Sequence, residues 1–262
     1  MTKKAILAVS FGTTYNETRK LTIEALERDL AAAFPDAQLY RAWTSGFVIR
    51  KLEKRDGVRI NNVPEALEQM LKDGITDVLV QPTHVINGIE NDKMLAQIRS
   101  YTDRFASMKV GTPLLTTVED ARACAEALHE DFSFVNPDEA VLFMGHGSEH
   151  YSNFVYPALN YLFRDLGYTN FFLGTVEGYP ELDSVLKDLK ILKPSKIHIS
   201  PFMIVAGDHA NNDLAGEDED SWKSILEAEG FAVEAHLIGL GQRERIRQLY
   251  VDHAKDAKEL VE

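Results

Sequence analysis

The chain has 262 residues, of which 45% are hydrophobic and 26% are charged, and its formal net charge at pH 7 is −13. This composition is typical of a globular protein and excludes a disordered, collagen-like or coiled-coil chain. The acidic balance argues against nucleic-acid binding, which needs clustered lysine and arginine. The only cysteine, Cys124, excludes an intrachain disulfide and fits a reducing compartment.

The first apolar run, residues 5–9, follows two lysines and superficially resembles the start of a signal peptide. It is shorter than the ~7–15 residues of a secretory apolar region. No stretch approaches the ~20 apolar residues of a membrane-spanning helix. We therefore expect a cytoplasmic protein that has no membrane partner.

Short apolar runs alternate along the chain with longer segments of helical period. The expected strands are 5–9, 38–42, 77–81, 108–111, 140–144, 171–175, 196–200 and 233–238. The expected helices are 16–34, 64–71, 91–105, 118–132, 153–166, 180–189, 221–228 and 243–260. Several strand runs are continuously apolar, which is typical of strands that are covered on both faces. The alternation predicts an α/β fold with parallel sheets and helices on both faces.

The first expected helix has a regular apolar stripe. Ile23, Leu26, Leu30 and Phe34 recur at the spacing of one helix face. Asn16 is a residue type that commonly caps helix N-termini. We therefore predict one continuous helix that begins after an Asn16 cap.

The two halves of the chain carry similar segments in the same order. Residues 6–13 align with 141–148, 42–46 with 174–178, and 82–90 with 201–209. The repeat predicts two similar doubly wound parallel-sheet domains, facing each other across a cleft, with ligands bound outside the carboxyl ends of the strands. We place the halves at 1–125 and 126–262, with the metal site in the second half and the last helix packing back on the first.

Three polar residues follow expected strands in the second half, namely His146, Glu177 and His209. Imidazole and carboxylate ligands suit a borderline divalent ion such as Zn, Co, Ni or Fe. Three protein ligands leave coordination positions open, as in a catalytic rather than a structural site. The alternative is that these are ordinary surface side chains that form hydrogen bonds.

Glu90 aligns with His209 in the repeat, so an acid would face an imidazole across the cleft. A carboxylate in that place can take protons. Alternatively, Glu90 is a first-turn glutamate that the helix dipole favours. His84 is either a second polar wall of the site or a residue packed beside the core.

Sequence motifs for nucleotide binding are missing or incomplete. No GxxxxGK[ST] segment occurs, and the two GxG segments, 145–147 and 239–241, do not extend to a dinucleotide fingerprint. Ser148 does not stand in a GxSxG motif of a hydrolase. We therefore expect no nucleotide and no organic cofactor.

These candidate residues lie in segments that are similar to a known family. The segments are 44–46, 49–52, 84–88, 143–147, 176–183 and 205–213. Across them, and over nearly the whole chain from Val9 to Gly241, the sequence resembles the anaerobic-type sirohydrochlorin cobalt chelatases of cobalamin biosynthesis, which are class II chelatases related to ferrochelatase. The resemblance implies that His146, Glu177 and His209 bind the metal and that Glu90 is the cleft glutamate.

The resemblance also implies the activity, which is insertion of Co²⁺ into sirohydrochlorin without ATP. His146 would act both as ligand and as leading base, and Glu90 would pass protons to solvent. The expected partners are the tetrapyrrole, the divalent metal and further copies of the chain in a homo-oligomer. Residues that we expect to bind the tetrapyrrole are Ser10, Thr13, Ser45 and His84. Cations that could offset its carboxylates are Arg50, Lys51, Arg55 and Lys93.

Other functions remain open at this stage. The same site could insert Fe²⁺ or Ni²⁺, because ligand type alone does not select among these ions. The chain could also carry a tetrapyrrole or a metal without catalysis. A third alternative is an α/β sensor for a small anion, similar to the periplasmic binding proteins.

Overall fold

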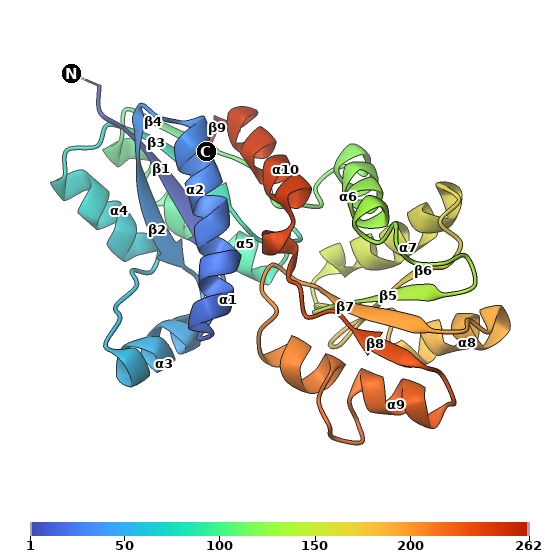
Figure 1. The fold of residues 1–262 in the computed structure, drawn as a ribbon. Coiled ribbons are helices and arrows are strands. Elements are labelled where there is room, and N and C mark those ends of the chain that lie inside the picture. Colours follow the sequence, from blue (N-terminus) through green and yellow to red (C-terminus); the bar gives the residue numbers. More distant parts are fainter. Residues whose placement is uncertain (1, 261–262) are drawn as a thin grey trace. The chain divides into compact units, whose positions relative to one another are not determined.

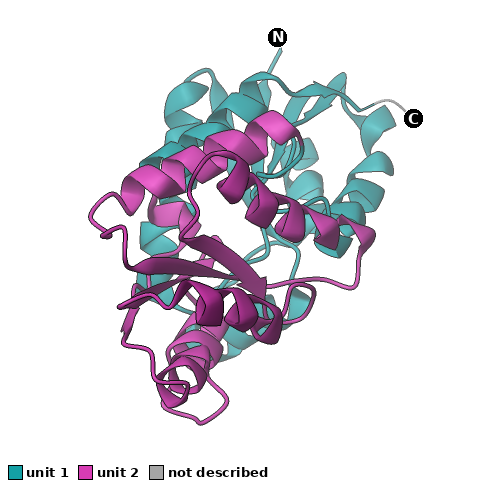
Figure 2. Ribbon diagram, turned by 90° about the vertical axis from the view of Figure 1, so that its right-hand side faces the viewer, with its two compact units in different colours: residues 1–116, 244–262 teal, residues 117–243 magenta. Residues whose placement is uncertain are grey.

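The structure, a computed structural model, describes residues 2–260. The chain forms two compact units, which Figure 2 shows in different colours. Unit 1 runs to Thr116 and resumes at Glu244, and unit 2 is Thr117–Arg243. No helix in the described part of the chain is long and apolar enough to cross a membrane.

Unit 1 is built on a five-stranded sheet (Figure 1). Its strands are β1 (Lys4–Ser10), β2 (Ala37–Trp43), β3 (Asp77–Pro82), β4 (Ser107–Val110) and β9 (Lys258–Glu259). The order is β2-β1-β3-β4-β9, and all pairs are parallel except β4 with β9. The helices are α1 (Asn16–Leu21), α2 (Ile23–Ala33), α3 (Gly46–Asp56), α4 (Val63–Lys72), α5 (Ile89–Arg99) and α10 (Glu244–Lys255).

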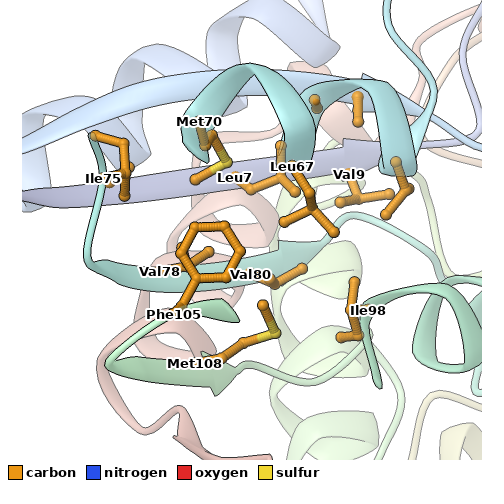
Figure 3. Close-up of a cluster of buried hydrophobic side chains, with 14 of the residues drawn as sticks. Leu7, Val9, Leu67, Met70, Ile75, Val78, Val80, Ile98, Phe105 and Met108 are labelled. Carbon is orange, nitrogen blue, oxygen red and sulfur yellow. The ribbon is translucent and has the colours of Figure 1, made fainter. Parts of the chain in front are cut away.

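The core of unit 1 lies against one face of this sheet, as Figure 3 shows. Leu7 and Val9 of β1 meet Leu67 and Met70 of α4 there. The intervening residue Ala8 is also fully buried, because α2 and α10 pack on the sheet as well. Burial on both faces explains why the strand runs are continuously apolar.

Unit 2 has a four-stranded, fully parallel sheet in the order β6-β5-β7-β8. The strands are β5 (Ala140–Gly145), β6 (Phe171–Thr175), β7 (Ile197–Phe202) and β8 (Val233–Ala235). The helices are α6 (Val118–Asp131), α7 (Val155–Asp165), α8 (Leu182–Leu192) and α9 (Trp222–Ala228), with a π-helix at Ala210–Leu214. Apart from β9, both sheets follow the same strand order, so the expected α/β fold with two similar parallel sheets is confirmed.

The single helix expected over 16–34 is wrong. The segment forms α1 and α2, and the break falls at Thr22, whose hydroxyl donates a 2.6 Å hydrogen bond to the carbonyl of Thr18. Such back-bonding by threonine competes with the helical backbone and bends helices. Asn16 is also not the cap, because Tyr15 takes that position and Asn16 is the first helical residue.

Apolar periodicity does not predict helix α3, although its ends carry helix signals. The hydroxyl of Ser45 accepts a hydrogen bond from the backbone N–H of Val48, and Gly57 ends the helix in the left-handed conformation. The boundary between the compact units also differs from the expected halves 1–125 and 126–262, since α6 lies wholly in unit 2. The last helix, α10, belongs to unit 1.

Helix α10 is held against the unit 1 sheet by Tyr250, which is fully buried. Its hydroxyl lies 3.2 Å from the carbonyl oxygen of Thr83 and 3.1 Å from that of His84. We predict that Tyr250→Phe lowers the free energy of unfolding by about 1–2 kcal/mol, because buried carbonyls lose a donor. Chemical denaturation measures the change. The exposed Tyr161 provides the control, and an equal loss in Tyr161→Phe would contradict this role.

Candidate metal centre

His146 and Glu177 are brought together where β5 and β6 end. The parallel pairing of the two strands continues past their last residues, because the N–H of Val176 donates to the carbonyl of Gly145 (3.0 Å) and the N–H of Glu177 donates to that of His146 (2.8 Å). Backbone hydrogen bonds therefore set the spacing of the two side chains, whose His146 Nδ1 and Glu177 Oε2 atoms are 3.8 Å apart.

The loop after His146 requires a glycine. Gly147 has a φ of +85°, and a Cβ at this position would lie 2.6 Å from the backbone nitrogen of Gly178. The side chain of Asn153 joins the two loops further, since it accepts from the N–H of Ser148 (2.9 Å) and donates to the carbonyl of Tyr179 (2.8 Å). The two loops are thus fixed to each other before any ligand binds.

His209 comes from the third strand end, after β7, and immediately precedes the π-helix. Its Nδ1 lies 2.6 Å from Oδ2 of Asp213, within that π-helix. The preceding loop is held in place by the N–H groups of Leu240 and Gly241, which donate to the carbonyls of Met203 (2.8 Å) and Ile204 (3.0 Å). The second GxG segment therefore has a structural role as a support for this loop.

The three side chains form one cluster, as the sequence predicted. One possible ligand atom of each of His146, Glu177 and His209 lies within 4.8 Å of the others. The two imidazole rings are perpendicular, with centroids 4.8 Å apart. All three side chains are partly exposed, at 45%, 59% and 33% respectively, so a solvent ion or a flat ligand can reach them.

Hydrogen bonds at Nδ1 orient both rings. Nδ1 of His146 lies 3.0 Å from the carbonyl oxygen of Gly147, which can only accept, and Nδ1 of His209 faces the Asp213 carboxylate. In a neutral ring the proton then sits on Nδ1, and Nε2 keeps its lone pair for a metal. A carboxylate behind a ligating histidine also raises its basicity. Sequence reasoning missed Asp213, although a carboxylate four positions after a histidine was visible.

The candidate residues of unit 1 form a separate polar group. Glu90 lies in the first turn of α5, and its Oε2 is buried without a hydrogen-bond partner among the described residues. The nearest cation is Nζ of Lys93, at 3.8 Å from this oxygen. Both ring nitrogens of His84 are also buried and have no such partner. Buried polar atoms without partners are rare and often mark functional sites.

Burial lowers the pKa of His84 from 6.5 to about 4, although the negative charge of Glu90 acts to raise it. The ring is therefore neutral in the folded protein near neutral pH.

This lowered pKa makes the stability of the protein depend on pH. Between about pH 6.5 and 4 the unfolded chain takes up a proton at His84 that the folded chain does not, so stability falls as the pH falls. The loss reaches about 3 kcal/mol. We predict that His84→Leu removes this part of the acid destabilisation, which denaturation at pH 7 and at about pH 4 measures. His253→Gln is the control, and an unchanged pH dependence in His84→Leu would refute the assignment.

The hydroxyls of Ser10, Thr13 and Ser45 have structural partners. Ser10 Oγ accepts from Thr83 Oγ1 at 2.9 Å, Thr13 Oγ1 accepts from the N–H of Tyr15 at 3.2 Å, and Ser45 caps α3. All three residues are buried. Their role in binding a tetrapyrrole stays a prediction.

A cavity of about 420 Å³ lies beside α3 in unit 1. Three of its lining residues are cations, Arg50, Arg59 and Lys93. Arg59 pairs with Glu65 at 3.1 Å, and Nζ of Lys93 donates to the carbonyl of Thr44 at 3.0 Å, whereas Arg50 is exposed and has no ion pair among the described residues. Two carboxylates, Glu53 and Glu65, also line the cavity, so Arg50 is the cation best placed to meet an anionic group there. Of the four cations named from the sequence, only Arg50 and Lys93 line it.

Comparison with known proteins gives the family. Residues 4–259 match the family described as cobalt chelatase (CbiK). The chain belongs to this family. It is 40% identical over 255 residues to the sirohydrochlorin cobaltochelatase of Salmonella typhimurium, with 97% of this chain and 96% of the relative aligned. It is 34% identical over 256 residues to sirohydrochlorin cobaltochelatase CbiKC of Nitratidesulfovibrio vulgaris, which covers 97% of this chain and 90% of that protein.

A solved structure shows the same fold at low identity. SirB from Bacillus subtilis, determined with Fe³⁺, superposes with a TM-score of 0.66 at 13% identity, covering 97% of this chain and 95% of that one. The family resemblance found in the sequence is confirmed by the family match and by the two relatives.

Asp213 provides a test of the histidine orientation in this chelatase family member. We predict that Asp213→Asn weakens Co²⁺ binding about 10–100-fold, because the amide orients the His209 ring less firmly and does not raise its basicity. Calorimetric titration of the metal-free protein measures the affinity. Asp220→Asn, at an exposed loop position, should bind as the wild type does. Equal affinities in the two variants would show that Asp213 does not act on His209.

Proposed function

We propose that this chain inserts Co²⁺ into sirohydrochlorin, without ATP, as a step of cobalamin biosynthesis. Two relatives that align with nearly the whole chain carry the name sirohydrochlorin cobaltochelatase. The structural observation that carries the proposal is the convergence of His146, Glu177 and His209 at the carboxyl edge of one parallel sheet. Three neighbouring strand ends that carry nitrogen and oxygen donors provide the ligands that a metal-transferring enzyme needs.

The chemistry that the site needs follows from the exchange of two pyrrole protons for one metal ion. A tetrapyrrole loses two pyrrole protons when one divalent ion enters the ring, so the site has to hold a metal and accept protons. Two imidazole nitrogens and a carboxylate bind Co²⁺ through exchangeable bonds and leave positions open toward the ring. His146 is first a ligand; once the ion leaves its Nε2 for the ring, that nitrogen is free to act as the leading base, whereas Glu177 and His209 serve as ligands.

Glu90 is the second proton acceptor. Its buried Oε2 lacks a hydrogen-bond donor, which leaves the oxygen available for a pyrrole proton. His84 is neutral near neutral pH, so beside Glu90 it can accept a hydrogen bond or relay a proton. The partial exposure of the Glu90 side chain, 31%, gives the proton a way to solvent.

Sirohydrochlorin carries several carboxylates, whereas the chain has a net charge of −13. Local cations therefore have to bind them, and Arg50 and Lys93 beside the unit 1 cavity are the candidates, together with Arg59. Ser10, Thr13, Ser45 and His84 complete the proposed tetrapyrrole contacts. We also expect the protein to act as a homo-oligomer.

The trio is tested by three substitutions with separate readouts. His146→Ala should abolish insertion, since loss of a general base alone costs about 10²–10⁴-fold. His209→Ala should weaken Co²⁺ binding and slow insertion severely. Glu177→Gln keeps the size but loses the charge, so metal affinity should fall while tetrapyrrole affinity is retained. The absorbance change of sirohydrochlorin with Co²⁺, Fe²⁺ or Ni²⁺ measures metal insertion. Single-turnover reactions distinguish an enzyme, which inserts the metal, from a carrier, which only binds it.

Matched controls are available outside the cluster. Glu219→Gln removes an exposed carboxylate from a loop, and His253→Gln removes a histidine of unit 1. Both should insert metal at the wild-type rate. Wild-type rates in folded His146→Ala and His209→Ala proteins would reject the site assignment.

A further inference from the structure

A second group of metal-binding side chains lies at the opposite edge of the unit 2 sheet. It consists of His198 on β7, Glu234 on β8 and His236 just beyond β8. His198 and Glu234 are direct neighbours in the parallel register, and the N–H of His236 continues the pairing by donating to the carbonyl of Ile199 (2.8 Å). Because side chains alternate along a strand, Glu234 and His236 point to the same face.

This group is separate from the His146 cluster. Strand β5 has Glu139, which contacts His198, before its first residue and His146 after its last. At about 3.3 Å per residue the two strand ends are roughly 20 Å apart. One ion cannot serve both groups, and the activity proposed above makes no use of the second.

The possible ligand atoms are spaced as a metal ion would need them. Nδ1 of His198 lies 2.9 Å from Nε2 of His236 and 3.8 Å from Oε2 of Glu234. Nε2 of His236 lies 3.9 Å from Oε1 of Glu234. A tetrahedral ion with bonds of 2.0–2.1 Å separates neighbouring ligand atoms by about 3.3 Å. The two nitrogens, which lie at hydrogen-bond distance, would move apart by about 0.4 Å to bind an ion, and Oε1 of Glu234 would approach His236 by about 0.6 Å.

A carboxylate outside the group orients the inner histidine. Oε2 of Glu139 lies 3.3 Å from Nε2 of His198, and the same oxygen accepts from the backbone N–H of Asn136 at 3.0 Å. When His198 donates its Nε2–H to Glu139, its Nδ1 lone pair points at His236. Carboxylate–histidine pairs of this kind accompany most histidine metal ligands.

Aromatic rings fix the two imidazoles. Phe134 contacts both rings, edge-on to His198 at 5.6 Å and tilted against His236 at 5.7 Å, and Phe132 lies edge-on to His236 at 5.6 Å. The His198 side chain is 3% exposed and that of His236 18%, whereas Glu234 is half exposed. The nitrogen ligands are thus preorganised, and an ion can enter from the side of Glu234.

Lys196 is the cation nearest to the group. Its Nζ lies 3.1 Å from Oε2 of Glu234 and 3.9 Å from Oε1 of Glu139. It neutralises only one of the two carboxylates, and Oε1 of Glu234 is left for an ion.

We propose that His198, Glu234 and His236 bind one divalent transition-metal ion of the zinc and cobalt class. The ion joins the short edge strand β8 to β7 and stabilises unit 2. It stays bound while the substrate metal turns over at the other edge of the sheet.

The test counts bound metal in the full chain after removal of metal by a chelator. Equilibrium dialysis against Zn²⁺ or Co²⁺ and elemental analysis give the stoichiometry. The double variant His146→Ala/His209→Ala isolates the second group and should retain one equivalent. Adding His236→Gln to it should remove that equivalent. Zn²⁺ should also raise the melting temperature of the double variant, but not that of the triple variant.

Glu234→Gln is a milder substitution at a half-exposed position and should weaken binding in the double variant at least tenfold. His253→Gln in the same background should leave the bound equivalent in place. A folded double variant that binds neither Zn²⁺ nor Co²⁺ would overturn the proposal, as would a bound equivalent that survives both His236→Gln and Glu234→Gln. Neither result bears on the His146 cluster, because that cluster is already disabled in this background.

Discussion

Parallel pairing of β5 with β6 and β7 is the constraint on which the candidate metal centre depends. Parallel strands end at the same edge of a sheet, so residues that follow different strands can meet there although they lie far apart in sequence. The hydrogen bonds from Val176 and Glu177 to the β5–loop backbone extend this pairing beyond the sheet. The spacing of His146 and Glu177 therefore comes from the backbone ladder, and only His209 depends on a longer loop with its own supports.

The two units show how one strand order can carry different chemistry. In unit 1 the last residue of β1 is Ser10, and the loops after β1 and β2 hold Thr13 and Ser45; the hydroxyls of all three bond to neighbouring backbone or side chains. In unit 2 the corresponding loops present partly exposed ligands instead. After the third strand, unit 1 places Glu90 and unit 2 places His209. The two units thus share a strand order, while their strand-end residues form a polar support in one and a candidate metal cluster in the other.

Periodicity located all eight expected strands, because strands buried on both faces leave long apolar runs. The places of His146, Glu177 and His209 after expected strands predicted that they cluster, and the family resemblance added the metal-binding role. The failures have local causes. The break at Thr22 depends on a side-chain hydrogen bond that apolar spacing does not encode. Helix α3 has few buried residues, and its charged sequence hides its amphipathic pattern. Asp213 reaches His209 through a π-helix, a geometry that a sequence pattern does not reveal.

In each of the two histidine groups of unit 2 a carboxylate orients one imidazole ring, but the two groups differ in solvent exposure. Asp213 orients His209 at one edge of the sheet, and Glu139 orients His198 at the other. At the first edge the histidines are 45% and 33% exposed, so water and a tetrapyrrole can displace ligands. At the second edge the side chains of His198 and His236 are only 3% and 18% exposed, and Phe134 packs against both rings, so an ion can be reached only from the side of Glu234. Exposure, rather than ligand type, therefore separates a site suited to transfer of an ion from one suited to retention.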